Sequence, residues 1–159
     1  MFIKFNIAES SNGRTTDFGS VYSGSNPGSA AMRTIKQVYK INASVDKVWK
    51  ALVDPKVIDK WGGGPASMDD KLNTEFTLWG GDIHGKNIEV VRNKKLVQDW
   101  FSGIWDKSTK VTFTLIEKGS NTELNLLHEN VPDEETNDIA DGWRTYYLGP
   151  LKKLLENKL

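Results

Sequence analysis

The chain has 159 residues, which suits one domain, and its basic and acidic residues balance at 21 each. Such a chain lacks the basic excess that holds phosphates, so we expect no nucleic-acid partner. The absence of cysteine excludes disulfides, thiolate metal sites and a cysteine nucleophile. The first residues do not resemble a signal peptide, and no apolar run approaches the ~20 residues that span a bilayer. We therefore predict a cytoplasmic protein without a membrane span.

Residues 1–31 differ in composition from the rest of the chain, and we assign the folded domain to residues 32–159. The first segment is rich in Ser, Gly, Asn and Thr, so it buries too little apolar surface to offset its ordering entropy. One hypothesis is a disordered tail. The other is a mis-assigned start, with Met32 as the true first residue. Residues 24–27 (GSNP) favour the second, because GGT-TCG-AAT-CC can encode them and resembles the T-arm of a transfer-RNA gene.

The domain opens with a predicted strand and two short helices. Alternating apolar residues in 33–42 indicate the strand. Ser44 is a predicted N-cap for a helix whose apolar residues follow the i, i+3, i+4, i+7, i+8 pattern. Pro55 is expected at the first position of the second helix. The apolar residues of the two helices are Val45, Val48, Trp49, Leu52 and Val53, then Val57, Ile58 and Trp61.

From about residue 67 to 131 the apolar period is two, which predicts strands. Residues 84–92 and 95–102 are separated by two turn residues, and 119–121 form another turn. Turns this short require antiparallel pairing. With the first strand, we predict a sheet of about seven strands. The inward residues are expected to include Phe76 and Leu78, then Val111, Phe113 and Leu115, then Leu124, Leu126 and His128.

The C-terminal region is predicted to be a long amphipathic helix that starts after Pro132. Pro150 should kink or break it near residues 146–149, because interior proline removes a backbone hydrogen bond. Such a helix can cover one face of the sheet, which gives an α+β fold. A curled sheet around a helix leaves space that can hold a ligand. The apolar stripe of the helix is Ile139, Trp143, Tyr147, Leu151 and Leu154.

Two long segments carry a family resemblance. VWKALVDPKVIDKW (48–61) and NVPDEETNDIADGWRTYYLGPLKKLLE (130–156) resemble the helix pair and C-terminal helix of the activators of the heat-shock protein 90 ATPase. Gly142-Trp143 and Tyr146-Tyr147 are the most specific positions. The resemblance covers residues 32–159 and implies a helix-grip, START-like (Bet v-like) domain of the SRPBCC superfamily. Eukaryotic activators carry a separate N-terminal domain that makes much of the chaperone contact, and residues 1–31 are too short and too polar to form one. Many single-domain relatives look like binders of small apolar ligands.

Motifs for catalysis or metal binding are weak, and we predict no catalytic residue, no metal and no cofactor. His84 and His128 lack metal-ligand spacing; His84 is expected on the surface and His128 on the inner face. The acidic residues near 133–141 suit the positive end of a helix. The glycine runs at 62–64 and 80–86 do not have P-loop spacing.

Aromatic residues give the strongest functional indication. We predict an apolar ligand cavity lined by Trp143, Tyr147, Leu151, Phe113, Leu126, His128, Trp61 and Trp79. The first hypothesis is thus a non-catalytic module for a small hydrophobic or lipid-like ligand. The alternatives are a co-chaperone-like interaction protein of a heat-shock protein 90 homologue, and a cyclase or hydratase with His128 as base and a tyrosine as acid. The orientation of Trp100, Phe101 and Trp105 stays open; an exposed aromatic patch there would indicate a protein partner.

Overall fold

The computed structural model describes residues 32–102 and 108–157. The two hypotheses for residues 1–31 and the orientation of Trp105 lie outside the described residues. In the described part, a six-stranded antiparallel sheet curves around a C-terminal helix. The predicted α+β helix-grip class is confirmed, and the sheet has six strands where about seven were expected.

The elements follow the predicted order of strand, two helices, strands and helix. The strands are β1 (Met32–Ile41), β2 (Glu75–Leu78), β3 (Ile83–Val91), β4 (Lys95–Ser102), β5 (Thr109–Lys118) and β6 (Asn121–Pro132). The helices are α2 (Val45–Val53), α3 (Pro55–Trp61), η1 (Trp79–Gly81), η2 (Asp133–Glu135), α4 (Thr136–Gly142), η3 (Trp143–Tyr147) and α5 (Leu148–Asn157). The sheet order is β1-β6-β5-β4-β3-β2, so β1 and β2 are its edges.

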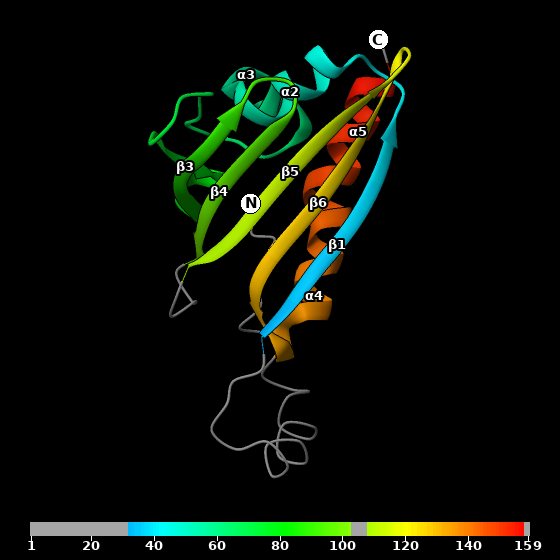
Figure 1. The fold of residues 1–159 in the computed structure, drawn as a ribbon. Helices are drawn as coiled ribbons and strands as arrows, with labels where there is room; N and C mark the ends of the chain where they lie inside the picture. Colours follow the sequence, from blue (N-terminus) through cyan, green and yellow to red (C-terminus); the bar gives the residue numbers. More distant parts are fainter. Residues whose placement is uncertain (1–31, 103–107, 158–159) are drawn as a thin grey trace.

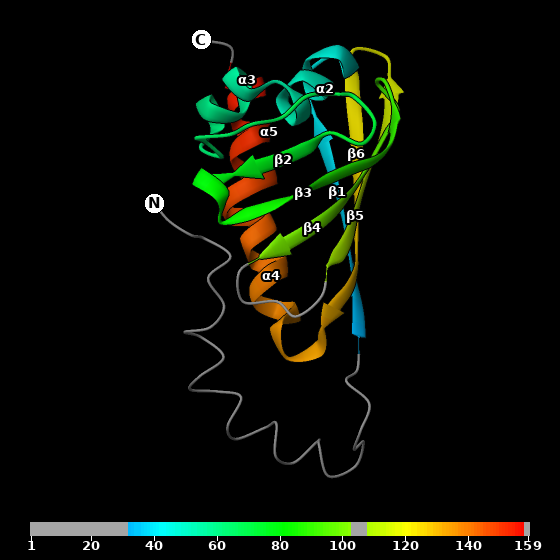
Figure 2. The ribbon, with the colours of Figure 1, turned by 90° about the vertical axis from the view of Figure 1, so that its left-hand side faces the viewer.

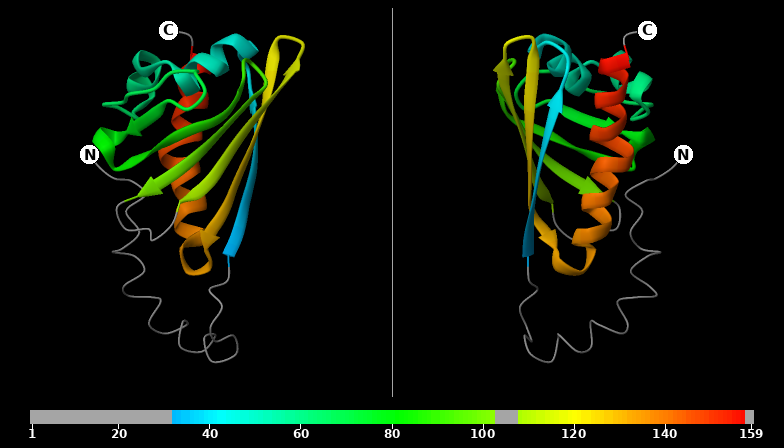
Figure 3. Two further views of the ribbon diagram at one scale, coloured as in Figure 1. Left: turned by 60° about the vertical axis from the view of Figure 1, so that its left-hand side comes forward. Right: turned by 90° about the vertical axis from the view of Figure 1, so that its right-hand side faces the viewer.

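The helices lie on the concave side of the sheet. Figure 2 shows the α4–η3–α5 helix running along this side, and both views of Figure 3 show α2 and α3 grouped near the end of α5. The opposite face of the sheet carries no helix in these views. The buried apolar residues of these helices and of the sheet form one hydrophobic cluster.

Local signals explain the two short helices. The Ser44 side chain accepts a hydrogen bond from the Lys47 amide, as the N-cap prediction required. Asp54 caps α3, and Pro55 occupies its first position. The indole of Trp61 donates to the Ala51 carbonyl over 2.8 Å, which fixes α3 against α2.

The segment before β2 adds no further strand to the sheet. Only Ser67 forms a bridge there, to Thr77. The segment is also held by the buried Asn87, whose side chain donates to the carbonyl oxygens of Asp69 and Lys71 and whose backbone bonds with Asn73 and Thr74. Side-chain and backbone hydrogen bonds together thus hold this segment beside β3.

Pro150 disturbs the C-terminal helix at the predicted place, but in a different way. The helix does not break; residues Trp143–Tyr147 form a π-turn, in which the Leu148 amide donates to the Trp143 carbonyl. A π-turn adds one residue to the helical repeat and accommodates a local mismatch without ending the helix. The turn places both Trp143 and Tyr147 on the buried side.

Candidate functional site

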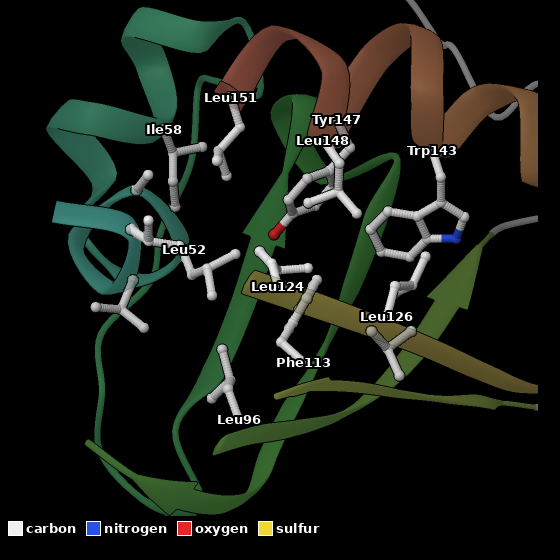
Figure 4. Close-up of a cluster of buried hydrophobic side chains, with 14 of the residues drawn as sticks. Leu52, Ile58, Leu96, Phe113, Leu124, Leu126, Trp143, Tyr147, Leu148 and Leu151 are labelled. Carbon is white, nitrogen blue, oxygen red and sulfur yellow. The ribbon is translucent and has the colours of Figure 1, made fainter. Parts of the chain in front are cut away.

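The structure brings together the eight residues predicted to line a cavity. Trp143, Tyr147 and Leu151 come from the helix and face the sheet residues Phe113 and Leu126, as Figure 4 shows. Phe113 and Leu126 are direct partners in the β5–β6 register. Trp61 closes this region from α3 and Trp79 from η1, while His128 lies further along β6. All except the half-buried Trp79 are buried.

Ring contacts occupy the centre of this region. Tyr147 packs against Trp61 at 4.4 Å between ring centroids, against Trp143 at 4.8 Å and against Phe113 at 5.7 Å. Trp79 meets Tyr147 edge-on at 6.1 Å. These separations are those of rings in direct contact. The side chains predicted to contact a ligand therefore contact one another, and the cavity itself stays a prediction.

Trp100 is a central member of this cluster that the sequence left undecided. It is fully buried and stacks on Trp143 at 4.8 Å. Its neighbour Phe101 points to the other face, is 37% exposed and stacks on the exposed His84. The signal that could have placed Trp100 is its shared parity with Leu96, which faces Phe113. The exposed pair Phe101 and His84 agrees with the predicted surface position of His84.

His128 forms a closed hydrogen-bonding chain inside the core. Its Nδ1 accepts from the Trp143 indole over 2.9 Å, so in the neutral ring the proton is on Nε2 and points at the Thr109 hydroxyl, 2.8 Å away. Burial lowers the pKa of His128 to about 3. A neutral histidine with both nitrogens engaged is a weak candidate for a general base near neutral pH. It ties β5 and β6 to the helix.

In the aromatic core, two buried polar atoms of the described part have no hydrogen-bond partner. They are the hydroxyl oxygen of Tyr147 and the indole nitrogen of Trp49. Burial also raises the pKa of the Tyr147 hydroxyl far above its ordinary value, so it stays protonated. Figure 4 shows this hydroxyl directed from the helix toward the sheet. An unpaired buried hydroxyl costs about 1–3 kcal/mol, and a ligand atom that accepted its proton would remove that cost.

The acidic residues and the other features considered for metal or membrane binding form no further site in the described part. The acidic residues at the start of the last helix are exposed or half-buried, and Asp133 forms an ion pair with Arg33 of β1. Across residues 32–102 and 108–157, the His, Asp and Glu side chains form no group that could hold a metal ion. No helix in the same residues is long and apolar enough to cross a bilayer.

The comparisons with known proteins agree with this architecture. The family model described as "Activator of Hsp90 ATPase homolog 1-like protein" matches residues 42–156. A protein of Schizosaccharomyces pombe, C1711.08, is 27% identical over 95% of this chain and 47% of its own length. A match over 95% of the chain is longer than residues 32–159, so it extends into the segment before Met32.

Two relatives have names that refer to the chaperone. The human "Activator of 90 kDa heat shock protein ATPase homolog 1" is 22% identical over 76% of this chain and 36% of its own length. The solved structure of an Hsp90 activator from Plasmodium falciparum has a TM-score of 0.71 at 22% identity, covering 77% of this chain and 95% of that one. The chain spans less than half the length of the curated relatives named here. From the family-model match, the chain belongs to the activator of Hsp90 ATPase homolog 1-like family.

Proposed function

We propose that this domain is a non-catalytic module that binds a protein partner, and that the partner is a chaperone of the Hsp90 class. The observation that carries this choice is that Trp61, Phe113, Trp143 and Tyr147 contact one another in the interior. Side chains that contact one another in this way have less surface left to offer a ligand. The outer surface is therefore the better candidate for recognition, and the family supplies the class of partner.

The non-catalytic part of the proposal is supported by the two groups that an acid–base reaction would use. His128 has a pKa of about 3 and already engages both ring nitrogens. Burial moves the pKa of Tyr147 upward, away from neutrality. General acid–base catalysis works best when the pKa values of the two groups lie near the operating pH. Neither group meets this condition.

Titration of the full chain into a purified Hsp90 homologue tests the proposal. Isothermal calorimetry should give saturable heat, and the ATPase rate of the chaperone should change in proportion to the bound fraction. An unrelated neutral domain of similar size is the matched control. Absence of heat together with an unchanged ATPase rate would contradict the proposal.

The second candidate is a small ligand in the core, as the aromatic pattern predicts. It is favoured by one observation, the buried Tyr147 hydroxyl without a partner. A mostly apolar ligand with one acceptor atom would satisfy it. Native mass spectrometry of the chain, purified gently from its source cells, should then give a mass excess that denaturation removes. The Tyr147→Phe variant from the same cells should lose this excess, and a bare mass for both proteins would reject the candidate.

A further inference from the structure

An open groove lies at the end of the sheet, away from the aromatic core. Its volume is about 770 Å³, within the range of ligand-binding pockets. Val45 at the start of α2 forms one side, the turn residues 91–95 between β3 and β4 form the second, and residues 114–117 of β5 form the third. None of the residues predicted to line a cavity contributes to it. The groove is therefore a separate site.

Backbone hydrogen bonds hold the groove in shape. The Lys94 amide donates to the Val91 carbonyl over 2.9 Å and closes the turn. The Lys94 carbonyl accepts from the Leu115 amide over 2.8 Å and joins the turn to β5. Asn93 has a φ of 64°, a conformation that asparagine tolerates better than most residues. A pre-formed groove binds at a lower entropic cost than one that must be ordered.

The groove offers apolar contacts that nothing in the described part covers. Val91 is 42% exposed and Ile116 is 40% exposed. Leu115 beneath them is buried and belongs to the core. Two exposed branched side chains over a rigid base can accept one or two apolar side chains of another molecule.

The charge of the groove is positive and mostly uncompensated. Arg92 and Lys94 are exposed and form no ion pair within residues 32–102 and 108–157. Lys95 already pairs with Glu89 over 3.5 Å. Glu117 is the single acidic residue in the lining.

We infer that this groove docks a short acidic segment of a partner protein, with an apolar side chain seated on Val91 and Ile116. Carboxylates of the segment pair with Arg92 and Lys94. Electrostatic complementarity of this kind favours an acidic peptide over a basic one. A like-charged groove on a second copy of the chain repels this one. This docking does not depend on the identity of the partner, so it can be tested independently of the proposed function.

A selection from a phage-displayed library of short linear peptides, with the full chain as target, tests the inference. Enriched peptides should carry a large apolar residue flanked by Asp or Glu. In ¹⁵N-HSQC spectra, the best of them should shift resonances of residues 91–95 and 114–117. Enrichment of basic or purely apolar peptides, no enrichment, or shifts elsewhere would overturn the inference. Self-association through Ile116 in sedimentation experiments would overturn it too, because a second copy would then be the occupant.

Matched charge reversals sharpen the test. Arg92→Glu/Lys94→Glu should weaken binding of the selected peptide roughly tenfold, as expected for two ion pairs at a rim. The control Lys36→Glu/Lys40→Glu makes the same charge change on the exposed edge strand β1 and should leave the affinity unchanged. If both variants weakened peptide binding equally, the net charge of the protein would explain the effect, and the groove would be rejected as the binding site.

Discussion

The space between helix and sheet and the groove at the end of the sheet differ in what their side chains still lack. In the first, large aromatic rings contact one another, and Trp100, Trp143 and Tyr147 are fully buried. In the second, Val91 and Ile116 are exposed and two cations lack partners in the described part. Completed contacts stabilise the fold, whereas incomplete contacts are available for binding. Variants of the two regions should therefore differ in whether they change stability or binding.

The largest effect is expected for a pair of adjacent residues on opposite faces of β4. Trp100→Ala removes a buried ring that contacts Trp143 and Tyr147, so the free energy of unfolding should fall by about 3–5 kcal/mol. Phe101→Ala on the outer face should cost less than about 1 kcal/mol. Urea denaturation followed by fluorescence measures both. Similar losses for the two variants would mean that the inner face is not the core.

Acidification should destabilise the interior through His128. The ordinary pKa of this residue, 6.5, is lowered to about 3 in the folded state, so the unfolded state binds the proton first as pH falls. The contribution of neutral His128 to the free energy of unfolding is therefore fully present above pH 6.5. It is lost progressively as the pH falls toward 3. Between about pH 7 and pH 5 the free energy of unfolding should fall by about 2 kcal/mol. This follows because each pH unit below 6.5 costs ~1.4 kcal/mol.

His128→Gln is the control for this pH dependence. Glutamine can accept from Trp143 and donate to Thr109, but it does not titrate. Urea melts of the two proteins over the same pH range should diverge, with the shallower slope in the variant. Parallel slopes would show that carboxylates, rather than His128, cause the pH dependence.

Features set by interactions between residues close in the sequence were predicted correctly, and features set by contacts between distant segments were not. Ser44, Pro55 and the stripe from Ile139 to Leu151 were placed correctly, because capping and helical periodicity are local properties. Trp100 and Phe101 are adjacent aromatic residues that satisfy either parity of a strand, and the shared parity of Trp100 with Leu96 is what distinguishes them. The sheet has six strands where about seven were expected, and the segment before β2 is held by an isolated bridge and by hydrogen bonds to Asn87, which a period-two pattern does not predict.

The candidate site shows the same limit more strongly. The convergence of Trp143 and Tyr147 on the sheet was predictable from one helical stripe. The pairing of His128 with Thr109 was not, because it depends on the register between β5 and β6. The groove was missed altogether, since residues 45, 91–95 and 114–117 meet only in the folded chain. No local pattern marks such a meeting of three segments.

A smaller effect tests whether the core is complete without a ligand. Tyr147→Phe removes a buried hydroxyl that lacks a partner in the described part, so the free energy of unfolding should rise by about 1 kcal/mol. Thermal melts of the protein expressed in a heterologous host, where a specific ligand is absent, measure this change. A loss of stability instead would indicate that the hydroxyl has a partner, and the ligand hypothesis would gain support.

The smallest effect on stability is expected in the groove, and it completes the comparison. Arg92→Glu/Lys94→Glu changes two exposed side chains that make no ion pair in the described part, so the free energy of unfolding should change by less than about 0.5 kcal/mol. The same variant should weaken peptide binding, while Phe113→Leu in the core should lower stability and leave peptide affinity unaltered. Urea melts measure the free energy of unfolding of both variants, and fluorescence anisotropy measures their affinity for the peptide. If the groove variant unfolded more easily, its cations would be structural, and the division between a stabilising interior and a binding surface would fail there.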